Sequence, residues 1–356
     1  MLNKLSAVEE KYLDTERLIS DPATVSNPVE YARLMKEYKS QTPIIEAFRL
    51  YRQTLAEIEE AQLIMADDSD PEFAEMAEAE YYEKKKRAEE LEDELKILLL
   101  PRSPDDDKNV IVEIRAGAGG EEAALFVADL YRMYTMYAET AGFKTEPLNK
   151  NETELGGIKE ISFMVVGDGA FSRFKFESGV HRVQRVPETE SQGRIHTSTV
   201  TVAVLPEADD VEVEINPADL KIETCKSSGA GGQHVNKTES AIRIIHKPSG
   251  IIVECQEERS QFKNRDKAMK MLKTKLLDIK QREQDDAIAS ARRSQVGTGD
   301  RSERIRTYNY HESRVTDHRI GLTLYSLENF LNGDIGRMID ELTAADTAAR
   351  LRGEGE

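Results

Sequence analysis

The chain carries, at positions 227 to 237, the stretch Ser227-Ser228-Gly229-Ala230-Gly231-Gly232-Gln233-His234-Val235-Asn236-Lys237. It follows Lys221–Cys225, a short run typical of a β-strand, and three of the four residues 229–232 are glycine. Glycine frees the backbone and allows a partner to approach closely. Such loops often hold phosphate, but a Walker-type loop ends in Gly-Lys-Ser/Thr and this one continues with Gln-His. By composition alone, a flexible surface turn is the favoured interpretation.

The sequence around this stretch predicts a small α/β module. Further strands are expected at Ala241–His246 and Ile251–Glu254, followed by a basic helix from Arg265 to about Arg293. A charged stretch punctuated by Gly297 and Gly299 comes next. We therefore predict one domain over residues 220–312.

The sequence before this module predicts two more regions. Residues 1–105 read as amphipathic helices, with a loop at 67–70 and a linker at 101–107. Residues 106–219 alternate strand and helix signals, and residues 313–356 are expected to return to this middle domain. Strands are expected at 110–114, 161–166, 198–204 and 211–215, and a helix at 121–137. The expected fold class is a multidomain α+β protein.

Composition narrows the function classes. The chain has 356 residues and no apolar run near the ~20 residues that cross a membrane. Its first sixteen residues include four carboxylates, unlike a basic targeting peptide. Cys225 and Cys255 are the only cysteines, so we expect buried thiols, no disulfide framework and no zinc site. We expect a cytoplasmic protein without a metal or other cofactor.

The charge of the chain is unevenly distributed. The net charge is -18, but residues 1–100 hold 13 Lys+Arg against 24 Asp+Glu, a balance of -11. Residues 226–320 hold 20 against 13, a balance of +7. An acidic body with a basic segment can still bind RNA locally.

Three blocks carry a resemblance to a known family. The glycine-rich stretch resembles the Gly-Gly-Gln motif of class I peptide release factors. Arg115-Ala116-Gly117-Ala118-Gly119-Gly120-Glu121-Glu122-Ala123-Ala124 is similar to the opening of that family's codon-reading domain. Gly179-Val180-His181-Arg182-Val183-Gln184-Arg185-Val186-Pro187 matches it further on. The resemblance implies a helical N-terminal domain, a codon-recognition domain and a smaller domain bearing the Gly-Gly-Gln loop.

The resemblance implies a catalytic tip at Gly231, Gly232 and Gln233. In the family this tip enters the ribosomal peptidyl-transferase centre, where water attacks the peptidyl-tRNA ester. The backbone N–H of Gln233 would stabilise the developing charge, as an oxyanion-hole donor does. Its side chain would exclude nucleophiles larger than water, and the family carries N5-methylation on this glutamine. The protein would trigger an RNA active site and would not be an enzyme alone.

The resemblance also implies a stop-codon reader. Pro187-Glu188-Thr189 resembles the Pro-x-Thr loop of the branch that accepts UAA and UAG, whereas the other branch has Ser-Pro-Phe, which is absent from this sequence. Single-stranded RNA is read at base edges and by stacking, and the Thr189 hydroxyl can donate and accept. The remaining family positions correspond to Gly119 and Glu122 for the first base, His196 for stacking, and Gln184 and Thr197 for the third base.

These positions also have plainer interpretations. Glu121 and Glu122 could simply complement a helix dipole, and His196 could be an ordinary half-buried histidine. The basic helix, with Lys267, Lys270, Lys273, Lys275 and Lys280, could follow an RNA backbone or present a solvated face. In the family, residues 294–309 form a switch that repositions the domain bearing the glutamine.

The resemblance implies as partners the ribosome, with its rRNA, the mRNA stop codon and the P-site peptidyl-tRNA. It also implies a glutamine methyltransferase and a recycling GTPase, and no membrane. Two other function classes stay open. A rescue hydrolase would share the tip but lack the segment from Gly179 to Thr197, and it would end in a basic tail, whereas residues 341–356 are acidic. A non-catalytic RNA-binding adaptor would tolerate Gln233→Ala.

Overall fold

The structure is a computed structural model that describes residues 2–65, 71–100, 103–187, 192–208, 213–226 and 239–352. The chain divides into two compact units, residues 1–103 with 340–356, and residues 104–339. The division at Ser103/Pro104 falls within the predicted linker. None of the helices in the described ranges is long and apolar enough to span a bilayer.

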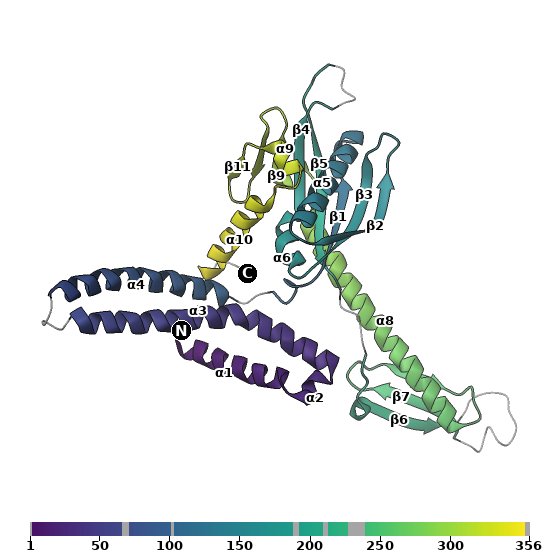
Figure 1. The fold of residues 1–356 in the computed structure, drawn as a ribbon. Coiled ribbons are helices and arrows are strands. Elements are labelled where there is room, and N and C mark those ends of the chain that lie inside the picture. Colours follow the sequence, from purple (N-terminus) through teal and green to yellow (C-terminus); the bar gives the residue numbers. More distant parts are fainter. Residues whose placement is uncertain are drawn as a thin grey trace. The chain divides into compact units, whose positions relative to one another are not determined.

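The first unit is built from helices. Its elements are α1 (Leu2–Ile19), α2 (Pro22–Val25), α3 (Pro28–Met65) and α4 (Pro71–Leu98). Figure 1 shows α3 and α4 as a long pair with α1 alongside α3. Their shared core includes Leu5 of α1, Phe48 of α3, and Leu91 and Leu95, which lie four residues apart on one face of α4. The predicted loop at 67–70 lies outside the described residues, between α3 and α4.

The second unit contains an eight-stranded sheet. Its strand order is β11-β10-β9-β4-β5-β1-β3-β2, and every neighbouring pair is antiparallel except β4 and β9, which are parallel. The bounds are β1 Val110–Ala116, β2 Lys144–Glu152, β3 Ile158–Val166, β4 Gly179–Arg185, β5 His196–Pro206, β9 Arg304–Asn309, β10 Arg314–Asp317 and β11 Leu322–Leu324.

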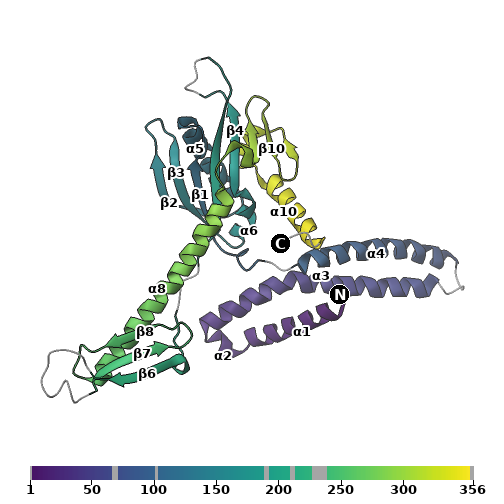
Figure 2. The same cartoon turned by 180° about the vertical axis from the view of Figure 1, so that it is seen from behind.

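Helices cover both faces of this sheet. Helix α5 (Glu121–Thr140) packs on one face, where Phe126, Val127 and Leu130 are fully buried with alternate residues of β1, β3 and β5. Shorter elements around it are α6 (Ala170–Phe174), η1 (Lys175–Glu177), α9 (Leu327–Leu331) and the start of α10 (Gly336–Leu351). The opposite face of β5 meets the last turns of α8 (Gln261–Val296), which Figure 2 shows from behind.

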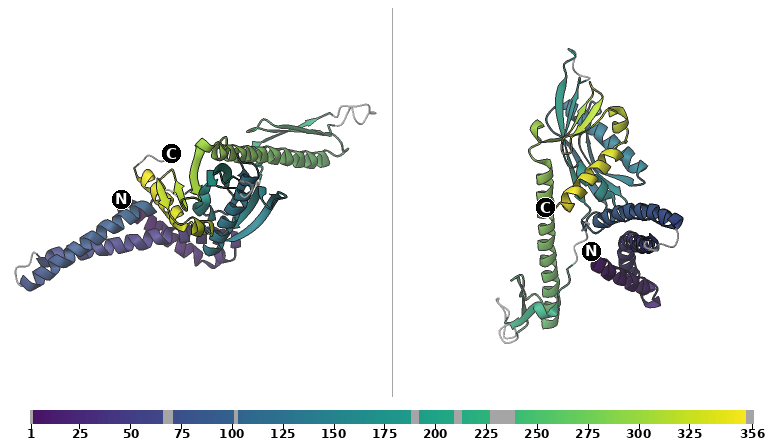
Figure 3. Two further views of the ribbon diagram at one scale, coloured as in Figure 1. Left: turned by 90° about the horizontal axis from the view of Figure 1, so that it is seen from above. Right: turned by 90° about the vertical axis from the view of Figure 1, so that its left-hand side faces the viewer.

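A second, three-stranded sheet lies at the other end of α8. Its order is β6 (Leu220–Cys225), β7 (Ala241–His246) and β8 (Ile252–Cys255), all antiparallel, preceded by η2 (Pro217–Asp219). Ile242, Ile244 and Val253 form a core with Ala268 and Leu272 of α8. Figure 3 shows α8 as one continuous helix.

The expected α+β fold class is confirmed, with one wrong strand. Residues 211 and 212 lie outside the described residues, and 213–215 form no strand. Their alternation reflects burial of Val213 and packing of Ile215 against the core of the smaller sheet, without a strand partner. The predicted domain limits stay predictions: β9 lies in the larger sheet, and residues 340–356 group with the N-terminal helices.

Candidate functional site

A glycine-rich turn joins β1 to α5 and is held against β5. The N–H of Gly117 donates to the Thr199 carbonyl (2.9 Å), and the N–H of Thr199 donates to the Ala118 carbonyl (2.8 Å). A side chain at Gly119 is excluded twice, because its φ is +140° and a Cβ would lie 2.4 Å from Ser198 Oγ. This position therefore requires glycine.

The first turn of α5 leaves polar groups available. Gly120 occupies the N-cap without a side-chain cap, and the N–H groups of Gly119 and Gly120 have no hydrogen-bond partner among the described residues. Glu122 is only 7% exposed, and its Oε1 accepts from Arg185 Nε at 2.5 Å. Its Oε2 is buried and has no partner within the described ranges. The start of α5 therefore carries both donors and an acceptor that make no hydrogen bond within the described residues.

Arg185, at the end of β4, neutralises this buried carboxylate. Its Nη1 donates to Asp129 Oδ2 (2.8 Å) and to the Tyr310 hydroxyl (3.0 Å), and its guanidinium lies 5.0 Å from the Tyr310 ring centre. Burial raises the pKa of Tyr310 to about 12, so the phenol stays neutral. The sequence patterns did not single out Arg185, which is one member of the block 179–187. Its strand also contains His181, Arg182 and Gln184, so a further polar residue at its end gave no distinct signal.

The β4–β5 hairpin brings three other predicted residues together: Gln184, His196 and Thr197. Gln184 pairs with Thr197, and Arg185 pairs with His196. Since side chains alternate along a strand, His196 shares the α5 side with Arg185, whereas Gln184 and Thr197 lie on the opposite face. Pro187, just after β4, is buried, whereas Glu188 and Thr189 lie outside the described residues.

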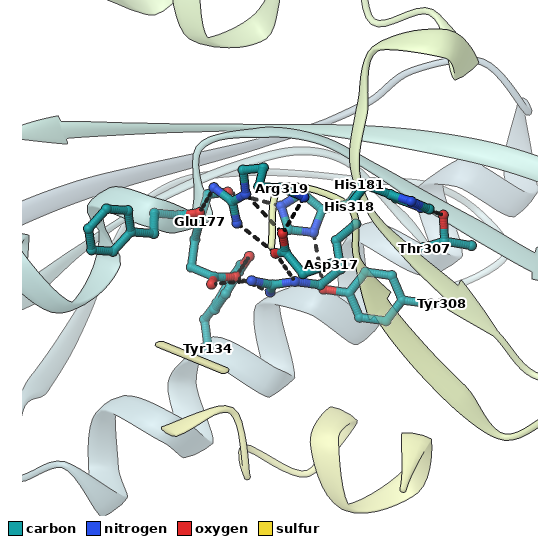
Figure 4. A network of polar contacts seen from close by, with 10 residues as sticks. Tyr134, Glu177, His181, Thr307, Tyr308, Asp317, His318 and Arg319 are labelled. Atoms are coloured by element: carbon teal, nitrogen blue, oxygen red, sulfur yellow. Dashed lines mark hydrogen bonds and ion pairs between the residues drawn. The ribbon is translucent and has the colours of Figure 1, made fainter. Parts of the chain in front are cut away.

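A buried ionic network fixes the strands behind this hairpin (Figure 4). Arg306 binds Glu177 through two hydrogen bonds, of 2.6 and 2.8 Å, and its Nε contacts Asp317 at 3.1 Å. His181 Nε2 lies 2.9 Å from the Glu177 carbonyl and Nδ1 lies 3.0 Å from the Tyr308 hydroxyl. Burial lowers the pKa of His181 to about 4. The neutral ring therefore donates from Nε2 and accepts at Nδ1.

The predicted catalytic tip occupies the loop between β6 and β7. Gly231, Gly232 and Gln233 lie outside the described residues. The base of their loop is described: Cys225 pairs with Ala241, and Thr224 Oγ1 donates to Glu239 Oε2 at 3.2 Å. Buried Asn264 of α8 donates to the Ser240 and Glu258 carbonyls, both at 2.8 Å. The described base of the hairpin is thus held by strand pairing and by side-chain hydrogen bonds.

The end of α8 and the residues after it are fastened to β5. Gln295 pairs with the N–H and C=O of Val204, at 2.8 and 2.9 Å. Arg292 binds Glu113 through two hydrogen bonds of 2.8 and 2.7 Å. The Thr199 hydroxyl donates to the Gly299 carbonyl at 3.2 Å. Thr199 therefore links the predicted switch, including η3 (Arg301–Glu303), to the glycine turn.

One predicted RNA-facing lysine is neutralised within the protein. Lys267 contacts Glu257 and Glu258 at 3.1 and 2.8 Å. The interpretation of Lys270, Lys273, Lys275 and Lys280 as RNA-facing stays a prediction. In the described part of the chain, no cluster of three or more His, Cys, Asp or Glu residues could hold a metal.

Comparison with known proteins defines the class. A PCRF domain model matches residues 8–202, and an RF-1 domain model matches residues 209–319. The chain belongs to the peptide chain release factor family.

Individual relatives match the chain over its whole length. It is 57% identical to peptide chain release factor 1 of Carboxydothermus hydrogenoformans, over 99% of this chain and 98% of that protein. It is 58% identical to the protein of that name from Caldicellulosiruptor saccharolyticus, over all of both chains. A solved structure described as RF2 of Thermus thermophilus is 33% identical, with a TM-score of 0.49, covering 97% of this chain and 96% of that chain.

Proposed function

We propose that this chain terminates translation: it reads UAA and UAG in the ribosomal A site and triggers hydrolysis of peptidyl-tRNA. The supporting observation is that the chain is 57% and 58% identical, over 99–100% of its length, to two proteins named peptide chain release factor 1. It acts only together with the ribosomal RNA active site, in the cytoplasm. Its further partners are a glutamine methyltransferase that modifies Gln233 and a recycling GTPase.

The first base is read at the start of α5. Uracil presents an N–H donor between two carbonyl acceptors. Glu122 Oε2, which has no partner among the described residues, accepts from that donor. The N–H groups of Gly119 and Gly120, which likewise make no hydrogen bond there, donate to a carbonyl. Cytosine has no N–H at this ring nitrogen, so it would leave the buried carboxylate oxygen unpaired, at a cost of ~1–3 kcal/mol or more.

The other bases are read from the β4–β5 hairpin. Pro187, Glu188 and Thr189 form the loop that contacts the first two bases, with the Thr189 hydroxyl selecting adenine at the second. His196 stacks on the bases. Gln184 and Thr197, neighbours across the hairpin, accept adenine or guanine as the third base, because an amide can turn and a hydroxyl can rotate.

Hydrolysis is triggered at the β6–β7 loop. Gly231 and Gly232 allow the backbone to approach the tRNA terminus, and the Gln233 N–H stabilises the oxyanion. The attacking group is water. Asn264 ties Ser240, at the described base of this hairpin, to Glu258.

The test is single-turnover peptide release from purified ribosome complexes with UAA or a sense codon in the A site. We expect codon-dependent release by the wild-type chain. Gln233→Ala and Gly232→Ala should lower the release rate at saturating factor by ~100-fold or more, with ribosome binding unchanged. Ser249→Ala, in the other turn of the same sheet, is the matched control. Equal release on the sense codon would indicate a rescue hydrolase, and unchanged release by Gln233→Ala would remove the catalytic assignment.

A further inference from the structure

Two arginines lie on the face of the larger sheet opposite α5. Arg182 of β4 is two residues before Gln184 and pairs with Thr199 and Thr307. Arg304 begins β9 and pairs with Val180, and a register shift separates this pair from the rest of the strand. By strand alternation, Arg182 shares its face with Gln184 and Thr197. Both arginines are half-buried.

Neither arginine has a carboxylate within ion-pairing distance in the described part of the chain. Arg182 Nε donates to Thr307 Oγ1 at 3.2 Å, and that hydroxyl lies 2.8 Å from His318 Nε2. The Nε of Arg304 is buried and has no partner among the described residues. Because a guanidinium carries five donors, most of the donors here are unused.

The other buried arginines of this unit are neutralised. Arg306 binds Glu177 and Asp317, Arg185 binds Glu122 and Asp129, and Arg292 binds Glu113. In contrast, burial and the neighbouring Arg304 lower the pKa of Arg182. Burial, Arg304 and Arg182 all lower the pKa of His318. Two adjacent cations that lack a carboxylate partner among the described residues repel each other, and an anion bound between them would relieve that repulsion.

We propose that Arg182 and Arg304 form a binding site for an RNA phosphodiester, beside the residues that read the third base. This proposal rests on the proposed function, which brings RNA to this face. Phosphate fits the unused donors, because an arginine fork binds its oxygens in pairs. The phosphate belongs either to the mRNA near the stop codon or to ribosomal RNA.

Release kinetics test the site. The second-order rate constant for release on UAA, kcat/KM, is measured across salt concentrations for wild type, Arg182→Gln, Arg304→Gln and the double variant. The logarithm of kcat/KM falls with the logarithm of salt concentration. Each arginine–phosphate interaction that is removed should reduce the magnitude of that slope by about one. The double variant should lose roughly tenfold in kcat/KM at low salt, while the rate at saturating factor is retained. Arg304→Lys should keep the slope, because the charge remains.

Two comparisons distinguish loss of this phosphate site from a general loss of positive charge and from misfolding. Arg337→Gln removes an exposed charge from α10 and should change neither quantity. Arg304→Gln removes one charge without removing the Arg182–Thr307 hydrogen bond, and an unchanged rate at saturating factor shows that the variant is folded. A wild-type salt slope in the double variant would overturn the phosphate site, whereas absence of stop-codon release by the wild type would instead refute the proposed function.

The source of the phosphate is assigned with modified mRNA. A single neutral methylphosphonate linkage is placed at successive positions from the stop codon onward. If one linkage reduces kcat/KM for wild type but not for the double variant, the mRNA supplies the phosphate. If the loss caused by the methylphosphonate and the loss caused by the double variant multiply at every position, ribosomal RNA supplies the phosphate. Either pattern supports the site, provided that the salt slope falls.

Discussion

At the residue scale, Glu122 accounts for how a helix that begins with two carboxylates is compatible with the proposed binding of an RNA base. Carboxylates in the first turn complement the helix dipole, and Glu121 and Glu122 both lie there. Glu122 is also buried, so its charge needs a counter-ion. Arg185 supplies that counter-ion to one oxygen and leaves the other without a partner among the described residues. The arrangement holds a carboxylate acceptor in a fixed direction.

Arg185 should therefore be a positioning residue for the first base. Arg185→Ala would leave buried Glu122 and half-buried Asp129 without their common cation, so the Glu122 carboxylate would lose its fixed direction. We expect about 2 kcal/mol lost in discrimination between UAA and CAA, roughly thirtyfold in the ratio of kcat/KM values. Arg185→Lys should recover only part of the discrimination between UAA and CAA, because lysine lacks the forked donors of the guanidinium.

The matched control for Arg185 is Arg132→Ala. Arg132 lines the same cavity of about 400 Å³ as Arg185 but bonds Asn332 instead of Glu122. Its loss should leave discrimination between UAA and CAA unchanged. Equal discrimination by wild type and Arg185→Ala would show that Arg185 does not position Glu122.

At the element scale, the buried network joins η1, β4, β9 and β10. A parallel pair such as β4–β9 connects segments far apart in the sequence, and the Glu177–Arg306 pair crosses that junction. Removing one member of a buried pair is costly because a charge is left uncompensated. The network therefore holds the strands that carry Gln184 and Arg185.

This network makes stability depend on pH through His181. The folded pKa is lowered to about 4, whereas the unfolded value is ~6.5. As pH falls below 6.5, His181 binds a proton in the unfolded chain but stays neutral in the folded chain. The free energy of unfolding therefore falls until about pH 4. The lowered pKa values of Glu177 and Asp317 extend the loss to lower pH.

Urea unfolding at pH 7.5 and pH 5.0 measures the effect. His181 should cost the unit 104–339 about 2 kcal/mol between these pH values. His181→Gln should be less stable than wild type at pH 7.5 but should show a smaller fall on acidification. A fall equal to that of the wild type would mean that the buried imidazole does not set the pH dependence.

Sequence patterns predicted some elements well and missed others. Apolar alternation located β1, β3 and β5, and the basic run located α8, because burial on a regular period leaves a trace in the sequence. Strand β2 was missed because it is an exposed edge strand containing Pro147. At β4, His181 and Arg185 stand where an apolar residue is normal, since ionic and hydrogen-bonded partners allow their burial.

At the scale of the whole molecule, charge separates by role. The N-terminal helices carry the acidic excess, and the larger sheet presents Arg182 and Arg304, which have no carboxylate partner among the described residues. The family resemblance identified six described candidate residues: Gly119, Glu122, Gln184, Pro187, His196 and Thr197. Sequence alone could not find Arg185, because its partners Asp129 and Tyr310 meet it only through the packing of α5 and β9.

The central claim is that one chain couples reading of UAA and UAG to peptide release. The most direct measurement is kcat/KM for peptide release on UAA, UAG, UGA and a sense codon, using wild type and a variant in which Pro187–Thr189 is replaced by Ser-Pro-Phe. The wild-type chain should release on UAA and UAG and be slower on UGA and the sense codon by orders of magnitude, and the replacement should weaken UAG reading. Comparable wild-type rates on UAG and UGA, or an unchanged preference after the exchange, would contradict this account.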